Sequence, residues 1–112
     1  MTLELDHIQR LNLHALLGAQ RGDVATIRAL WAIQDRLSLA AEEEAALGLK
    51  REFVGGRDHV VWDLAATIPT KSMVFSDAEI ARIRAAIETW DSYAAASDRR
   101  WLEPLLRAIL QP

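Results

Sequence analysis

Residues 49–63 read LKREFVGGRDHVVWD, and this stretch decides the fold class of the chain. Two runs rich in β-branched and aromatic residues lie on either side of the dipeptide Gly55-Gly56. A two-residue hairpin turn of type I′ needs positive φ at both central residues, which glycine adopts without strain. The stretch therefore predicts a β-hairpin. Because a lone hairpin is marginally stable in water, we expect it to pack on helices or to gain a third strand from residues 71–75.

Helical patterns precede the hairpin. Apolar residues recur at helical spacing over 6–20 and over 23–37, and Asp23 is a good N-cap for the second of these segments. Ser38 is expected to cap a short third helix. That helix should end at Gly48, because glycine suits the position directly after a helix.

Helical patterns also follow the hairpin. Ser76-Asp77-Ala78-Glu79 is a capping box, which predicts a fourth helix running to about Tyr93. A last helix is expected to start near Ser97 or Asp98. It contains Pro104, which either kinks the helix or lies in the first turn of a shorter one.

The composition of the 112-residue chain is that of an ordinary globular protein, with 51% hydrophobic and 26% charged residues and a net charge of −3. The absence of cysteine excludes a disulfide framework, a Cys-ligated metal and a cysteine nucleophile. No apolar run has the length of a membrane span, and the acidic start differs from a signal peptide. We therefore expect one soluble, cytoplasmic α+β domain over residues 1–112, mainly helical. It should have about five helices, with a β-hairpin or small antiparallel sheet between helices three and four.

The candidate chemical groups do not combine into a site. His7 and His14 lie two helical turns apart, about 10.5 Å along the axis, whereas chelation on one helix uses a spacing of three or four residues. We expect both to face solvent. His59 falls on a predicted strand without a catalytic partner, and the side chains of 42–44 (three glutamates) fan out around a helix. The sequence therefore predicts no catalytic residue, no metal site and no cofactor, and a protein that is not an enzyme.

Nucleic-acid binding is the alternative function. The hairpin region is the one segment of the chain with a net positive charge, and the candidates are Lys50, Arg51, Arg57 and Lys71. A DNA-binding domain usually carries a stronger basic face. Walker, dinucleotide-binding and serine-hydrolase motifs are absent. We therefore expect nucleic acid to be an unlikely partner.

Two helices have more apolar surface than a small domain normally buries. Apolar residues cover about half of the helical wheel over 23–37 and in the last helix, whereas a surface helix usually needs a stripe of about 100°. The excess indicates either burial on two sides or a partner. Tryptophan is enriched as an interface anchor, so Trp31 and Trp101 are the better candidates of the four tryptophans. The predicted interface residues are Leu30, Trp31, Ile33, Trp101, Leu105 and Ile109.

The order of features carries a resemblance. Gly-Asp-x-x-Thr-Ile at 22–27 follows a Leu-rich helix, Leu-Ser-Leu-x-x-Glu-Glu-Glu spans 37–44, and Val-Val-Trp-Asp at 60–63 precedes Phe-Ser-Asp-x-Glu at 75–79. Over about residues 8–95 the chain is similar to a group of small uncharacterised proteins encoded by bacteriophages and prophages. The resemblance implies a phage origin and action in the bacterial cytoplasm or the virion.

These readings together predict the function. We expect a non-enzymatic protein–protein interaction module that docks Trp-anchored helix faces onto another molecule. Its partner would be a second copy, giving a homo-oligomer, or a host or virion protein.

Overall fold

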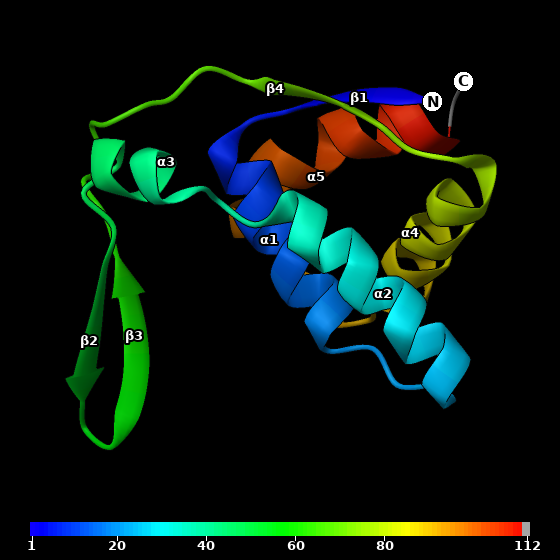
Figure 1. Cartoon of the computed structure of the whole chain (residues 1–112), viewed down its shortest axis with the longest axis horizontal. Helices are drawn as coiled ribbons and strands as arrows, with labels where there is room; N and C mark the ends of the chain where they lie inside the picture. The colour runs from blue at the N-terminus through cyan, green and yellow to red at the C-terminus, as the bar shows by residue number, and fades with distance from the viewer. Residues whose placement is uncertain (111–112) are drawn as a thin grey trace.

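Figure 1 shows the computed structural model of the chain, which describes residues 1–110. In chain order the elements are β1 (Thr2–Leu5), α1 (His7–Gly18), α2 (Val24–Leu37), α3 (Ala41–Ala46), β2 (Lys50–Val54), β3 (Arg57–Val61), β4 (Lys71–Val74), α4 (Asp77–Thr89) and α5 (Ala95–Leu110). Within the described residues there are thus five helices and two antiparallel sheets of two strands each. The fold is α+β and mainly helical, which confirms the predicted fold class.

The predicted hairpin forms between α3 and β4, and therefore between the third and fourth helices. Its strands β2 and β3 pair antiparallel, with Val54 opposite Arg57 next to the turn. Gly55 and Gly56 have φ angles of 62° and 81°, the left-handed conformation that a type I′ turn requires.

The predicted third strand also forms, but it does not join the hairpin. β4 pairs antiparallel with β1 instead, with Leu3 opposite Met73. The ammonium group of Met1 donates to the carbonyl of Phe75 at 2.9 Å, and the N–H of Phe75 donates to the carbonyl of Met1 at 2.8 Å. Leu5 fits the helical spacing of the residues that follow it, yet Leu3 and Leu5 are the two buried residues of an alternating strand. The segment thus fits both a helical and a strand pattern, and its pairing with β4 makes it a strand.

Side-chain caps set the starts of the helices. The carboxylate of Asp23 accepts from the backbone N–H three residues on, at 2.8 Å, and Ser76 and Glu79 form the predicted capping box of α4. The prediction for Ser38 is wrong. Its hydroxyl donates to the carbonyl of Gln34, so it ends α2, and α3 begins only at Ala41.

The last two helices have boundaries that differ from the prediction. α4 ends at Thr89, before Tyr93, whose hydroxyl donates to a carbonyl of α4 at 2.8 Å. α5 begins ahead of both predicted caps, Ser97 and Asp98, although the Asp98 carboxylate does accept from the N–H of the residue before the helix, at 2.7 Å. Pro104 lies inside α5 rather than at the start of a shorter helix.

One hydrophobic core lies between β1, α1, α2, β4, α4 and α5. Its fully buried members come from β1, from each of the four long helices and from the residue directly after β4; examples are Leu13, Ile33, Phe75, Ile83 and Leu105. In Figure 1 these helices lie below the ribbon of β1 and β4, while the hairpin lies to one side of them. No described residue of the hairpin belongs to the core.

Arg10 of α1 is a buried charge, with 1% of its side chain exposed. Its Nε donates to the carbonyl of Leu37 at 3.2 Å and its Nη2 to that of Ser38 at 2.8 Å, which satisfies two carbonyls at the end of α2. Its Nη1 and Nη2 also donate to the two carboxylate oxygens of Glu43 in α3, at 2.5 and 3.1 Å. One side chain thus joins α1, the end of α2 and α3.

Removing this guanidinium should destabilise the fold. Arg10→Met keeps the aliphatic stem but leaves two helix-end carbonyls and the Glu43 carboxylate without their donor, so we expect a loss of about 2–4 kcal/mol in the free energy of unfolding. Urea denaturation measures it. The matched control is Arg84→Met, which breaks an exposed pair with Glu88 one helical turn away and should cost less than about 0.5 kcal/mol. Equal losses in the two variants would contradict the role given to Arg10.

The same contact predicts an acid-sensitive stability. The hydrogen bond from Arg10, together with one from the backbone N–H of Ala40, lowers the pKa of Glu43 from its ordinary 4.5 to about 2. Because the pKa is lower in the folded state, the stabilisation is fully present above pH 4.5 and is lost as the pH falls through about 2. We expect Glu43→Gln to reduce the slope of unfolding free energy against pH in that window. Parallel profiles for the variant and the unmodified chain would refute this.

Candidate functional site

The hairpin carries exposed apolar side chains on both of its faces. Because cross-strand partners share a face, Val54 and Val61 lie on one face and Phe53 and Val60 on the other. Phe53 is 75% exposed, and Leu64, just beyond β3, is 86% exposed. We call Phe53, Val54, Val60, Val61 and Leu64 the hairpin patch. Apolar residues gathered on an element outside the core mark a candidate interaction surface.

The hairpin also has free strand edges. Its sheet consists of β2 and β3 alone, so each strand is paired on one side only. The N–H of Asp63 donates to the carbonyl of Leu47 at 3.0 Å, which continues the bonding between the two arms of the hairpin beyond β3. Among the described residues, no hydrogen bond reaches the outer edge of either strand. Unpaired backbone groups of this kind are a template for another strand.

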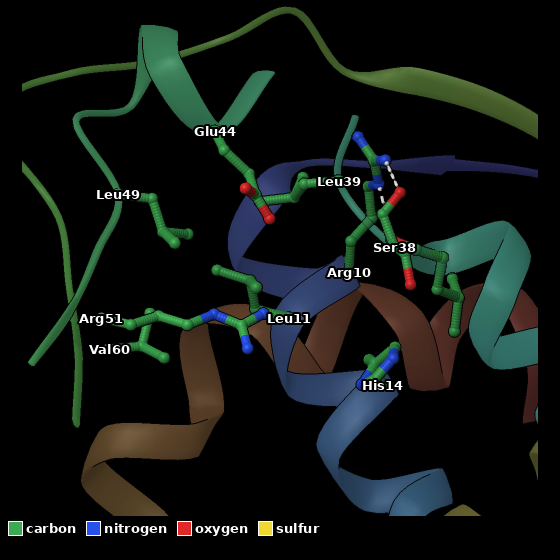
Figure 2. Close-up of a pocket in the computed structure, with 10 residues that line it drawn as sticks. Arg10, Leu11, His14, Ser38, Leu39, Glu44, Leu49, Arg51 and Val60 are labelled. Atoms are coloured by element: carbon green, nitrogen blue, oxygen red, sulfur yellow. Dashed lines mark hydrogen bonds between the residues drawn. The ribbon is translucent and has the colours of Figure 1, made fainter. Parts of the chain in front are cut away.

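A pocket of about 220 Å³ separates the base of the hairpin from α1 (Figure 2). Its lining includes Leu11 and His14 of α1, Glu44 of α3, and Arg51 and Val60 of the hairpin. Figure 2 shows the Arg51 side chain extending from β2 toward Leu11. Within the described residues, no hydrogen bond joins the His14, Glu44 and Arg51 side chains. The pocket therefore shows no assembled acid–base pair.

Five of the six predicted interface residues lie in the core of this one chain. Each is at most 5% exposed: Leu30, Ile33, Trp101, Leu105 and Ile109. α2 packs on α1 and α4, and α5 packs on the same two helices, so each half-wheel apolar face is covered from two sides. The expectation of surface anchors at these positions is corrected accordingly. Burial on two sides, not a partner, accounts for the excess apolar surface.

Trp31 is the predicted interface residue that stays on the surface, with 58% of it exposed. Val24 lies seven residues earlier on α2, on the same face two turns away, and is also exposed. Trp101 is fixed internally, because its Nε1 donates to the Asp98 carboxylate at 2.9 Å and its ring lies 6.4 Å from that of Tyr93. Only one of the two tryptophan anchors is therefore available to another molecule.

The four basic candidates do not form one face. Lys50, Arg51 and Arg57 are exposed on the hairpin, but register places Lys50 and Arg57 on one face and Arg51 on the other. Lys71 belongs to the other sheet, where its charge helps to lower the pKa of Glu43. Glu52 adds an acid to the face shared by Lys50 and Arg57.

The histidines lie apart from one another. His7 is buried at the junction of β1 and α1, which corrects the expectation that it faces solvent. His14 is half-buried and His59 is exposed on β3. Within residues 1–110, no group of three or more His, Asp or Glu side chains is arranged to hold a metal.

The hairpin patch is the feature that sequence reasoning missed. The sequence predicts the strands but expects helices or a third strand to cover them. A warning was present in the strand residues themselves, because apolar residues fall on both faces of the ribbon instead of alternating with polar ones.

No family model, curated protein or solved structure gives a significant match to this chain. Among the helices of residues 1–110, none is long and apolar enough to cross a bilayer.

The exposed position of the hairpin patch has a direct consequence for stability. Phe53→Thr and Val60→Thr keep β-favouring residues but remove apolar surface, so each should change the free energy of unfolding by less than about 1 kcal/mol. Ile83→Ala, in the core, should cost about 2–5 kcal/mol. Urea denaturation compares the three variants. Losses at Phe53 and Val60 as large as that at Ile83 would mean that the hairpin packs against the body in solution.

Proposed function

We propose that this chain is a non-enzymatic protein-binding module whose hairpin docks onto another protein molecule. The observation that carries the proposal is the contrast between the core and the hairpin. The core is built without the hairpin, yet the hairpin and Leu64 just beyond it provide the five exposed apolar side chains of the hairpin patch. Such surface is costly to leave in water unless another molecule covers it.

Strand addition is the binding mode that best suits this element. A partner strand beside β2 or β3 would satisfy the open backbone groups, and the alternating side chains would supply specificity. It would also turn a two-stranded ribbon, which is marginal in water, into a larger sheet. Trp31 on α2 is a second exposed anchor of the kind that contributes strongly to protein interfaces.

We propose two classes of partner. A second copy of the chain is one class. The resemblance to phage and prophage proteins supports a phage origin, and with it a host or virion protein as the other class. Nucleic-acid binding has less support, because residues 50–63 contain three Lys or Arg and three Asp or Glu, which leaves the hairpin without net charge.

Site-specific photo-crosslinking tests the proposal. A photoreactive residue at position 53 or 64 of the full chain, in cells that naturally produce it, should yield discrete crosslinked proteins, because both side chains lie exposed on or beside the hairpin. The matched control is position 84, exposed on α4. Adding Val54→Thr and Val60→Thr should weaken the crosslinks from position 64. No product at 53 and 64, or the same products at all three positions, would overturn the proposal.

A further inference from the structure

We propose that the hairpin pairs with the hairpin of a second copy of this chain, β3 against β3, around a two-fold axis at Val60. This inference rests on the proposed protein-binding function and names its partner. It follows from three features of the hairpin: which backbone groups are open, which side chains the symmetry brings together, and the charge of the ribbon.

The open edge of β3 is defined by the alternation of backbone groups along a strand. The N–H of Asp63 points to the β2 arm, because it donates to the carbonyl of Leu47 at 3.0 Å. Arg57 flanks the two-residue turn, where the N–H bonds back across the turn to Val54. Successive residues turn their N–H and C=O groups to opposite edges. Residue 60, between these two on the opposite parity, therefore presents its N–H and C=O to the outside.

Two-fold pairing about Val60 brings complementary side chains together. In this antiparallel register Val60 lies opposite its own copy, and Arg57 lies opposite the second copy's Asp63. Symmetry repeats the Arg57–Asp63 contact, so two ion pairs close the ends of the paired strands, on the same face of the sheet. Both side chains are exposed, and one oxygen of the Asp63 carboxylate already accepts from the N–H of Ala65 at 2.9 Å. Val61 of one copy meets His59 of the other between them.

Two registers along β2 match less well. Pairing along β2 about Arg51 would set Lys50 against Glu52 but would place two Arg51 side chains directly opposite each other, and like charges so placed are destabilising. Pairing along β2 about Phe53 sets both Lys50 and Arg51 against glycines of the turn. The Val60 register alone among these gives apolar contact at the centre and opposite charges at both ends.

The charge balance of the hairpin also favours a copy of itself as partner. Residues 50–63 contain three basic and three acidic residues, so two hairpins meet without net repulsion. The product is a four-stranded sheet in place of two isolated ribbons. A sheet of three or more strands can be stable in water, whereas a two-stranded ribbon is marginal.

A charge swap, measured by analytical ultracentrifugation, tests whether β3 pairs with β3 of a second copy. We expect the full chain to dimerise with rising concentration, and Arg57→Asp or Asp63→Arg alone to raise the dimer dissociation constant by about tenfold. The double variant should restore it to within about threefold. Positions 57 and 63 are six residues apart, with Asp63 two residues beyond the end of β3, and an extended chain of this length spans about 20 Å, so the rescue reports a contact between copies. Because the Asp63 carboxylate also accepts from the N–H of Ala65, Asp63→Asn serves as the variant that keeps this bond and still loses the pair.

The outcomes separate this inference from the proposed function. A chain that is monomeric at every concentration, or a dimer indifferent to the swap, would overturn β3 pairing. A dimer that responds instead to Lys50→Glu and its rescue by Glu52→Lys would place the contact on β2 and equally overturn it. If a different protein is crosslinked from position 53 in either case, the protein-binding function stands. If no protein is crosslinked, both fail.

Discussion

The ion pair between Arg10 and Glu43 is the contact on which the arrangement of this molecule depends. A guanidinium that is almost fully buried needs a hydrogen-bond partner at each of its nitrogens, because an unpaired charge in that environment is very costly. Arg10 meets this demand with the last carbonyls of α2 and the carboxylate of α3. The contact therefore fixes the path of the chain from α2 into α3. Since α3 leads through Gly48 directly into β2, it also fixes the base of the hairpin.

The core ends where the hairpin begins. Four long helices and the β1–β4 ribbon enclose all the core residues, and the hairpin is attached through α3, which contributes no residue to that core. The contacts that position the hairpin are thus different from the side chains that the hairpin exposes. Arg10 and Glu43 join α1 to α3, which leads into the hairpin, whereas neither Phe53 nor Val60 packs in the core. The proposed binding function would account for these side chains.

Local signals in the sequence predicted much of the local structure, although the cap predicted at Ser38 is wrong. Gly55-Gly56, Asp23 and the capping box at Ser76 each act within a few residues, and each prediction is confirmed. The partner of a strand is decided over long distances. Residues 2–5 become a strand because residues 71–74 lie beside them, and the alternation in so short a segment does not distinguish a strand from the helical spacing that Leu5 also fits. The same limit explains why five of the six predicted interface residues proved to lie in the core. An apolar half-wheel on α2 or α5 has the same pattern whether two helices or another protein cover it, and here two helices do.

The two edges of the hairpin differ in a way that bears on the proposed strand pairing. Proteins protect exposed strand edges with charged residues, and β2 begins with the consecutive charges Lys50-Arg51-Glu52. β3 ends instead in Val60-Val61, with Trp62 directly after it, and lacks a comparable run of charges over these positions. An unprotected apolar edge on a monomer is an aggregation hazard, unless pairing is limited to one partner and one register. Arg57 and Asp63 flank this segment with opposite charges, and a one-step slip would separate them. The edge with the least protection is therefore also the one whose flanking charges restrict how it can pair.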